Sequence, residues 1–242
     1  YGRCKTIEQD WKTRRKIPLL AGGDNVLKKH MDFASQNKEE YMETLKGLPV
    51  ANAINEKIIE EMKDWKGAIP HLAIVRVGER PDDMSYERGA TKKMEKVGFR
   101  CTSYTFPADI DNDTFQKEFD KINEDEDIDG ILLLRPLPKH LDEKAIENRI
   151  ASVKDLDGIS PMNLAKVYAG DPTGYGPCTA EAVIEMLDYA GVDLKGKRAV
   201  VIGRSLVIGK PVAMMLMKKN ATVTVCHTKT VDMPGVCKDA EV

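Results

Sequence analysis

Apolar residues recur along this chain with two periods that alternate. Over residues 50–66 they follow helical spacing, so that Val50, Ile54 and Ile58 share one face. A continuous apolar run at 72–77 then predicts a buried strand. The same alternation predicts helices at 85–97, 114–123 and 143–150 and strands at 101–106 and 130–134. Strands that alternate with helices predict an α/β fold with a parallel sheet covered by helices.

Residues 154–179 interrupt this alternation. The segment is rich in glycine and proline, which predicts a loop-rich hinge between two domains. Beyond it, Thr179 is predicted to cap a helix that runs to Tyr189. A strand at 197–202, a helix at 210–219 and a strand at 222–226 follow. Residues 1–41 show no clear hydrophobic period and are interpreted as a helical or disordered extension.

Composition and charge exclude several classes of function. The 242 residues carry 37 Lys and Arg against 39 Asp and Glu, a net charge of -2, so no broad basic face for nucleic acid is expected. No apolar run approaches the roughly 20 residues that span a membrane. The five cysteines are scattered, with no CxxC pair or Cys/His cluster. We therefore expect no metal site and a reduced, cytoplasmic setting.

A glycine turn follows the strand at 197–202, with the sequence Gly203-Arg-Ser-Leu-Val-Ile-Gly-Lys-Pro211. Gly203 allows a tight turn, and Gly209 lets the next helix approach both the sheet and a bound pyrophosphate. Unpaired N–H groups at that helix start attract negative charge, and Pro211 suits the first turn because it lacks an N–H. Between two strands, this variant fingerprint predicts a nicotinamide dinucleotide site. Its expected contacts are Gly203, Arg204, Ser205, Ile208, Gly209 and Pro211.

The second strand of this unit ends where such folds meet the adenosine ribose. A site selective for NAD favours Asp or Glu there, whereas this chain has His227, Thr228 and Lys229. With Arg204 in the turn, these donors suit a 2′-phosphate, so NADP is favoured and NAD is the alternative. The competing interpretation is an ordinary turn between a strand and a helix that carries surface cations.

Further motifs occur in a fixed order from Leu45 to the end of the chain. They are Leu45-Lys-Gly-Leu-Pro-Val-Ala51, Val77-Gly-Glu-Arg-Pro81, Ser85-Tyr86, Lys96-Val-Gly-Phe99, Pro136-Leu-Pro138, Lys154-Asp-Leu-Asp-Gly158 and Pro177-Cys-Thr179. With the glycine turn, their order and spacing resemble the methylenetetrahydrofolate dehydrogenase/cyclohydrolase family.

The resemblance implies a folate-substrate domain at 42–160 and a Rossmann-type NAD(P)-binding domain at 161–242. The Rossmann domain is expected to be incomplete, since it stops after its second strand, and residues 1–41 stay unassigned. The family oxidises 5,10-methylenetetrahydrofolate to 5,10-methenyltetrahydrofolate and hydrolyses that product to 10-formyltetrahydrofolate. It is commonly dimeric, which implies a homodimer for the full-length protein.

The resemblance also implies roles for individual residues. Tyr86 would lie over the folate, and Asp157, rather than Asp155, would pair with the amino groups of the pterin through charge-assisted bonds. Without the resemblance, Tyr86 is a helix-packing aromatic and Asp157 a turn residue. The thiol of Cys178 has no adjacent base, so packing is favoured over nucleophilic attack. Substrate contacts are expected from Tyr86, Leu134, Pro136, Leu137, Pro138, Asp157, Pro177 and Cys178.

Two positions depart from the family pattern. A catalytic Lys usually follows the Tyr by four residues on the same helix face, and here that residue is Ala90. A Gln usually precedes the Pro-Leu-Pro motif, and here Leu134 replaces it. Lys92 matches a second family Lys on another face and is the remaining catalytic candidate.

These departures separate the two activities. Hydride transfer depends mainly on positioning, whereas hydrolysis needs activation of water and proton transfer. We therefore expect dehydrogenase activity, with cyclohydrolase activity weak or absent. One alternative is a bifunctional enzyme in which Lys92 or Lys93 substitutes for the missing Lys. The other is a non-catalytic remnant that binds folate or nucleotide.

Overall fold

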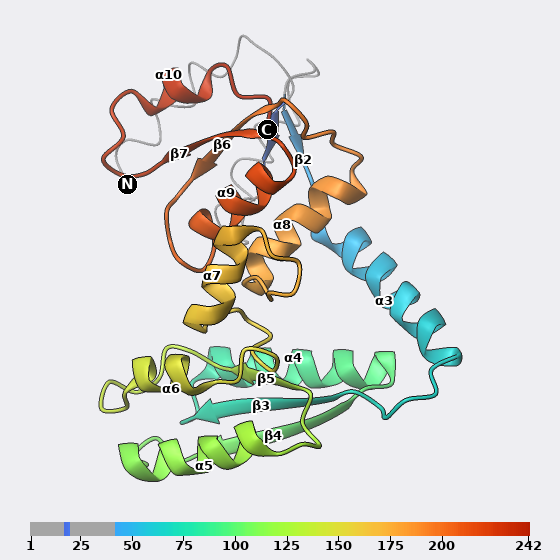
Figure 1. Ribbon diagram of the computed structural model, residues 1–242, viewed down its shortest axis with the longest axis vertical. Coiled ribbons are helices and arrows are strands. Elements are labelled where there is room, and N and C mark those ends of the chain that lie inside the picture. Colours follow the sequence, from blue (N-terminus) through green and yellow to red (C-terminus); the bar gives the residue numbers. More distant parts are fainter. Residues whose placement is uncertain (1–16, 20–41) are drawn as a thin grey trace. The chain divides into compact units, whose positions relative to one another are not determined.

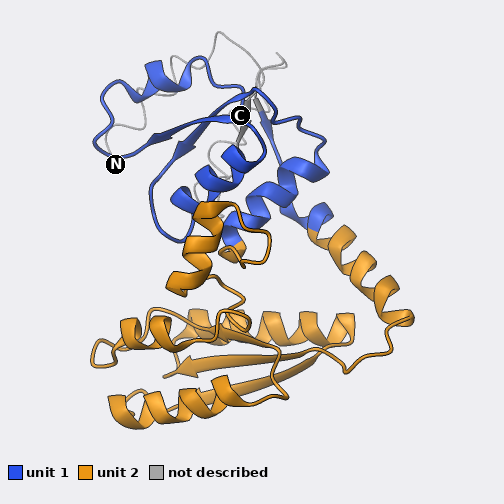
Figure 2. Cartoon of the chain, in the orientation of Figure 1, with its two compact units in different colours: residues 1–50, 179–242 blue, residues 51–178 orange. Residues whose placement is uncertain are grey.

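The computed structural model describes residues 17–19 and 42–242, which form two compact units (Figure 1, Figure 2). Unit 1 comprises the described residues up to Val50 together with Thr179–Val242, and unit 2 comprises Ala51–Cys178. The strand pairs in the described residues are all parallel, and helices connect β3 to β4, β4 to β5 and β6 to β7. The predicted α/β class is therefore confirmed.

Unit 2 is built on a three-stranded parallel sheet in the order β4-β3-β5. Its strands are β3 (His71–Val77), β4 (Arg100–Phe106) and β5 (Gly130–Leu133), and its helices include α4 (Pro81–Val97), α5 (Asn112–Glu124) and α6 (Glu143–Arg149). Each lies within a few residues of a predicted element. Helix α4 begins four residues earlier than predicted, since Pro81 is suited to a first turn, and it ends at Gly98 as expected.

The core of unit 2 lies on both faces of this sheet, because successive side chains of β3 point to opposite sides. On one face, Ala73 and Val75 pack with residues of α5 and α6, among them the fully buried Phe115. On the other face, Leu72 and Ile74 pack with the side chains of α4. This second contact fixes α4, the helix that carries Tyr86, against the sheet.

The hinge segment contains a helix that the prediction of a loop missed. Helix α7 runs from Pro161 to Ala169, so the prediction is wrong over these residues. Ser160 caps it by accepting a hydrogen bond from the Asn163 N–H, and Gly170 ends it in the left-handed conformation. The proline and glycine that indicated a loop are the start and stop signals of a short helix.

Helix α7 belongs to unit 2, which extends to Cys178. The fully buried Asn163 donates from Nδ2 to the Asp155 carboxylate at 2.9 Å and to the Ser152 carbonyl at 2.9 Å. These bonds tie the helix to the loop that follows the sheet of unit 2.

Unit 1 contains the glycine turn. Its two parallel strands are β6 (Arg198–Ile202) and β7 (Thr222–Cys226), joined by α9 (Gly209–Lys218) as predicted. Glu241 and Val242 also bond to the backbone of β6. The remaining elements are α3 (Gly47–Lys63), which runs from unit 1 into unit 2, α8 (Cys178–Tyr189), α10 (Met233–Cys237), and the parallel pair β1 (Ile17–Leu19) and β2 (Met42–Thr44).

Two predictions concern the start of α8 and the N-terminal residues 1–41. Helix α8 begins at Cys178, so Thr179 lies inside its first turn rather than capping it. Apart from β1, the interpretation of residues 1–41 as an extension falls outside the described residues.

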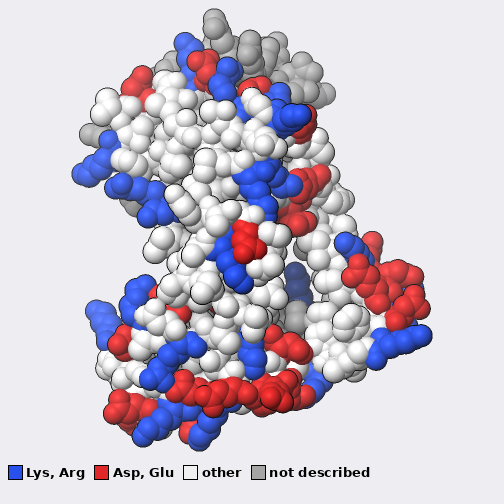
Figure 3. Space-filling model, in the orientation of Figure 1, with Lys and Arg blue, Asp and Glu red and all other residues white. Residues whose placement is uncertain are grey.

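The described surface carries both signs of charge. Lys and Arg side chains are interspersed with Asp and Glu over the face shown in Figure 3, as the net charge of -2 leads one to expect. Helices in the described part of the chain all fall short of the length and apolarity that crossing a membrane requires. Exposed apolar side chains include Ile202, Leu206 and Ile208, which surround the glycine turn.

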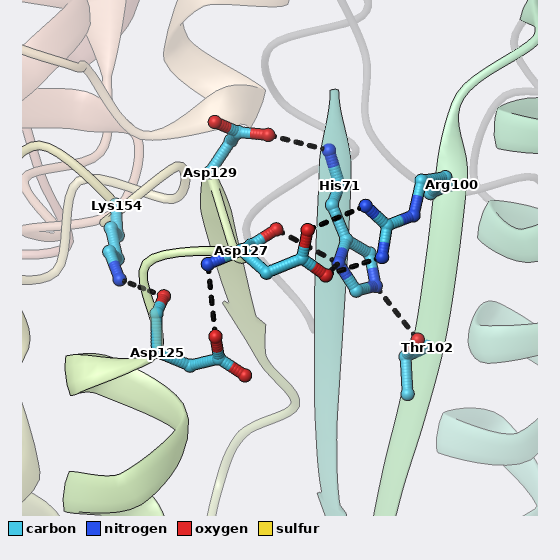
Figure 4. Close-up of polar contacts among 7 residues, drawn as sticks. All are labelled: His71, Arg100, Thr102, Asp125, Asp127, Asp129 and Lys154. Carbon is cyan, nitrogen blue, oxygen red and sulfur yellow. Dashed lines mark hydrogen bonds and ion pairs between the residues drawn. The ribbon is translucent and has the colours of Figure 1, made fainter. Parts of the chain in front are cut away.

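A polar network joins the starts of the three strands of unit 2 (Figure 4). Buried His71 places Nδ1 3.0 Å from the Asp127 carbonyl oxygen and Nε2 2.8 Å from Thr102 Oγ1. Arg100 donates to the Asp127 carboxylate at 2.7 Å, and Asp129 accepts from the His71 N–H at 2.8 Å. The network therefore ties together the amino ends of the strands, away from the ends where the predicted substrate residues follow.

Acid should weaken this network over a defined range of pH. The hydrogen bond and charge of Arg100, with a smaller contribution from His71, lower the pKa of Asp127 to about 2. The unfolded value is about 3.9, so the folded state binds fewer protons than the unfolded state between these values. Stabilisation is thus complete above about pH 4 and is lost as the pH falls toward 2.

The variant Asp127→Asn should therefore show a smaller loss of unfolding free energy over this range, measured by urea titration at several pH values. The matched control is Asp109→Asn, an exposed carboxylate of the same unit, which should keep the profile of the parent. An Asp127→Asn profile that parallels the parent would contradict the assignment.

Candidate functional site

Two of the predicted substrate residues, Tyr86 and Cys178, lie near Asp157 in unit 2. Its Oδ1 accepts a hydrogen bond from the Cys178 N–H at 3.3 Å, and its Oδ2 lies 3.7 Å from Arg135 Nη2. The side chain is 26% exposed. The carboxylate is therefore held from two sides while part of it stays open to a ligand.

Gly158 explains how the chain brings Cys178 to Asp157. Its φ of +60° lies in the left-handed region, and a Cβ there would stand 2.6 Å from the Tyr175 carbonyl oxygen and 2.8 Å from Pro177 N. Only glycine lets residues 175–177 cross so closely. This crossing delivers the first residue of α8 to the carboxylate.

The neighbouring Asp155 has a structural role. It is 1% exposed, and its oxygens accept from the N–H groups of Ile159 at 3.0 Å and Ser160 at 2.8 Å as well as from Asn163 Nδ2. Both oxygens of its carboxylate thus already accept hydrogen bonds from the loop and from α7. This supports the prediction that Asp157, and not Asp155, is available to a substrate.

Tyr86 lies close to the same carboxylate. Burial raises the pKa of its hydroxyl above the ordinary value, and the nearby Cys178 and Asp157 raise it further. The side chain as a whole is 57% exposed, so much of the ring faces solvent. Cys178 also donates from Sγ to the Leu156 carbonyl at 3.2 Å. Tyr86, Asp157 and Cys178, which are 92 residues apart from first to last, thus form one neighbourhood.

The two positions that depart from the family pattern pack together. Leu134 is 8% exposed and belongs to the apolar cluster on the α4 face of the sheet, and Ala90 packs against that cluster. Lys92 is exposed and stands about 240° around α4 from Tyr86. Ala90, one turn after Tyr86, occupies the face that the family's Lys would use.

The other predicted substrate residues have different surroundings. Leu137 is buried in the core, and its N–H donates to Glu143 Oε2 at 2.8 Å. Pro136 is exposed and follows a cis peptide bond, Pro138 is partly buried and Pro177 is buried. Contact between these residues and a substrate stays a prediction.

Arg135 is a charged residue of this site that the sequence prediction missed. It lies between Leu134 and Pro136, and ion pairs connect it with Asp157 and with Glu147 of α6. A signal was present in the sequence, since a cation directly follows a strongly apolar strand at the edge where parallel sheets place their sites.

The glycine turn in unit 1 has a well-defined geometry. Gly203 has a φ of +132°, and its N–H donates to the Cys226 carbonyl at 2.8 Å. Ser205 Oγ accepts from the N–H groups of Ile208 at 3.0 Å and Gly209 at 3.4 Å, so it orders the start of α9. A Cβ at Gly209 would stand 2.2 Å from the Gly203 carbonyl oxygen. Gly209 is therefore needed for closure of the turn itself. Pro211 is buried in the first turn of α9, as expected.

The segment after β7 forms a second tight turn. The His227 N–H donates to Thr230 Oγ1 at 2.8 Å, and His227 Nδ1 accepts from the Lys229 N–H at 3.1 Å. Thr228, Lys229 and Arg204 are exposed. Within the described residues, no carboxylate forms an ion pair with Lys229 or Arg204. Both cations are thus available to an anionic ligand.

Comparison with known proteins assigns both units. Residues 45–157 match the catalytic domain of tetrahydrofolate dehydrogenase/cyclohydrolase, and residues 177–242 match the NAD(P)-binding domain of the same family. The bifunctional protein FolD of Clostridium kluyveri is 48% identical over 200 residues, which are 82% of this chain and 70% of that protein. The bifunctional FolD of Carboxydothermus hydrogenoformans is 48% identical over 202 residues, or 83% and 70% of the two chains.

Solved structures agree with this assignment. The bifunctional FolD methylenetetrahydrofolate dehydrogenase/cyclohydrolase from Campylobacter jejuni superposes with a TM-score of 0.76 at 34% identity, over 80% of this chain and 70% of that one. The N5,N10-methylenetetrahydrofolate dehydrogenase-cyclohydrolase of Trypanosoma brucei, solved with NADP cofactor and an inhibitor, gives a TM-score of 0.74 at 34% identity. That match covers 81% of this chain and 68% of the other.

Proposed function

This chain belongs to the tetrahydrofolate dehydrogenase/cyclohydrolase family, and we propose that it oxidises 5,10-methylenetetrahydrofolate to 5,10-methenyltetrahydrofolate with NADP as the oxidant. The observation that carries this proposal is the convergence of Tyr86, Cys178 and the partly open Asp157 in the unit that holds the catalytic domain. The reaction takes a hydride from the methylene bridge and leaves a cationic product.

Asp157 and Tyr86 supply the folate contacts. A carboxylate that is fixed on one side by the Cys178 N–H can accept two donors from the pterin on its other side. The exposed ring of Tyr86 offers a flat apolar surface beside it. Because hydride transfer depends chiefly on alignment of the reacting carbon, these positioning contacts are the main requirement.

The glycine turn fits the dinucleotide. Apart from Gly203 and its two neighbours in the chain, no described heavy atom lies within 4 Å of the place that a Cβ on Gly203 would occupy, so phosphate groups have room to approach the backbone. Ser205 accepts hydrogen bonds from the N–H groups of Ile208, Gly209 and Lys210. The start of α9 would therefore attract the phosphates through its helix dipole. When bound, the nicotinamide supplies the acceptor of the hydride. Arg204, His227, Thr228 and Lys229 would bind the 2′-phosphate, which supports NADP over NAD.

The direct test is spectrophotometric. The full chain is mixed with 5,10-methylenetetrahydrofolate and either NADP or NAD, and formation of the reduced cofactor is followed. We expect reduction of NADP that depends on the folate, with a lower kcat/KM for NAD. Binding of tetrahydrofolate without any oxidation would instead support the non-catalytic remnant.

The cofactor preference gives a second prediction. Lys229→Ala and Arg204→Ala should each raise KM for NADP about tenfold or more, because a charge-assisted bond to phosphate contributes about 1.5–3 kcal/mol. KM for NAD, which has no 2′-phosphate, should change little. The matched control is Lys218→Ala, an exposed Lys in the last turn of α9. An unchanged ratio of NADP to NAD efficiency in both variants would contradict these roles.

A narrower proposal concerns the cyclohydrolase reaction, which we expect to be weak or absent. It is supported by the packing of Ala90 against the cluster that contains Leu134, because an apolar contact occupies two positions where the family usually has Lys and Gln. A role for Lys92 stays the alternative.

Three further points stay proposals. We propose that residues 42–160 form the folate-substrate domain and that residues 161–242 form the cofactor-binding domain. The family resemblance favours a homodimer, and the scattered cysteines favour a cytoplasmic location.

A further inference from the structure

The burial of Arg135 at its position costs free energy of folding. Its side chain is 20% exposed, and its Nε is buried without a hydrogen-bond partner among the described residues. An unmet buried donor costs about 1–3 kcal/mol, and a buried ion pair often stabilises a fold no better than an apolar side chain. Stability alone therefore does not explain an arginine here.

The guanidinium stands among three carboxylates. Its Nη1 lies 3.3 Å from Glu147 Oε1 and 3.8 Å from Glu143 Oε1, both on α6, and its Nη2 lies 3.7 Å from Asp157 Oδ2. Without the arginine, these like charges would repel one another, and Asp157 is the member that lies on a loop. Helix α6 is tied to the segment after β5, because Glu143 accepts from the Leu137 N–H at 2.8 Å.

We propose that Arg135 is a positioning residue that holds Asp157 in place to bind the pterin, an inference that rests on the proposed function. The distance of 3.7 Å exceeds a hydrogen bond, so the arginine attracts Asp157 as a charge and leaves the Oδ2 lone pairs to donors of the substrate. Arg135 acts through Asp157, since its two Nη atoms face carboxylates of the protein. Glu143 and Glu147 of α6, which lie outside the pterin contacts, hold Arg135 and thereby support the affinity for folate.

The test uses the full chain and steady-state kinetics with 5,10-methylenetetrahydrofolate at saturating NADP. Arg135→Met keeps an unbranched stem of four heavy atoms and removes the charge. We expect KM for the folate to rise about tenfold with kcat within about threefold of the parent, because an interaction made equally in the ground and transition states is lost. Arg135→Lys should recover most of this loss. The control Arg149→Met removes a surface arginine that pairs with Asp120, and should behave as the parent.

A double-mutant cycle separates a positioning role from a merely structural one. If Arg135 acts through Asp157, Arg135→Met should add little to the loss already caused by Asp157→Asn. Full additivity of the two losses would overturn the inference. Thermal melting checks that each variant folds, and Arg135→Gln, which also removes the charge, replaces Arg135→Met in the cycle if the latter does not fold.

Failure of the inference is distinguishable from failure of the proposed function. If the parent oxidises the folate and Arg135→Met resembles Arg149→Met, only the role of Arg135 is wrong. If the parent does not oxidise it, calorimetric binding of tetrahydrofolate is measured across the same cycle, and additive losses or an absence of binding overturn the inference as well.

Discussion

Replacing Asp157 with Asn should lower kcat/KM for 5,10-methylenetetrahydrofolate by about 10²–10³-fold, mostly through KM. Each of two charge-assisted bonds to the pterin contributes about 1.5–3 kcal/mol, and the new amide would turn an N–H donor toward donors of the substrate. KM for NADP should stay close to that of the parent, since Asp157 lies in the catalytic domain. Steady-state kinetics with each substrate varied in turn, together with calorimetric binding of tetrahydrofolate, measures both effects.

Asp155→Asn is the matched control for this experiment. Its carboxylate accepts from Ile159, Ser160 and Asn163 inside the protein, so its loss should destabilise the loop by about 2–4 kcal/mol. Activity should then fall in proportion to the folded fraction, with KM for the folate unchanged in the protein that remains folded. A KM that rises in Asp155→Asn and not in Asp157→Asn would reverse the two roles.

The elements of the fold follow from local patterns in the sequence. The apolar run of β3 and the helical spacing of α3 specify their own structure, and Gly98 marks the end of α4. Helix α7 was missed because the proline at its start and the glycine at its end are equally typical of a loop. The attachment of α7 to the preceding loop was not predicted, because it depends on Asn163, whose bonds to Ser152 and Asp155 connect residues 8–11 apart.

The site was predictable to the extent that its residues lie in motifs. Asp157 and Tyr86 came from the family resemblance, and their proximity to Cys178 agrees with it. Arg135 was missed because the carboxylates around it are brought there by the fold, from α6 and from the loop after it. Ala90 and Leu134 were each recognised as departures, but their membership of one apolar cluster is a tertiary fact that spacing does not reveal.

The apolar cluster that contains Leu134 and Ala90 is expected to have a large effect on the hydrolysis of methenyltetrahydrofolate. A positioned acid–base group accelerates such a step by about 10²–10⁴-fold, so the parent should hydrolyse the methenyl compound at about 1% or less of its oxidation rate. Both rates are measured on the same preparation, with the uncatalysed hydrolysis subtracted. A hydrolysis rate comparable to the oxidation rate would contradict the proposal, and its loss in Lys92→Ala would then identify Lys92 as the substitute.

Restoring the polar pair should restore part of this activity. In Ala90→Lys alone, the new amine would enter an apolar cluster beside Leu134, where burial disfavours its charged form and the cost falls on stability. The double variant Ala90→Lys with Leu134→Gln gives the amine a hydrogen-bond partner, so it should gain at least about tenfold in hydrolysis and exceed either single variant. Oxidation should persist, because neither side chain is among the hydrogen-bond or ion-pair partners of Asp157. If the double variant folds, oxidises the folate and gains no hydrolysis, these two positions do not account for a difference between the activities.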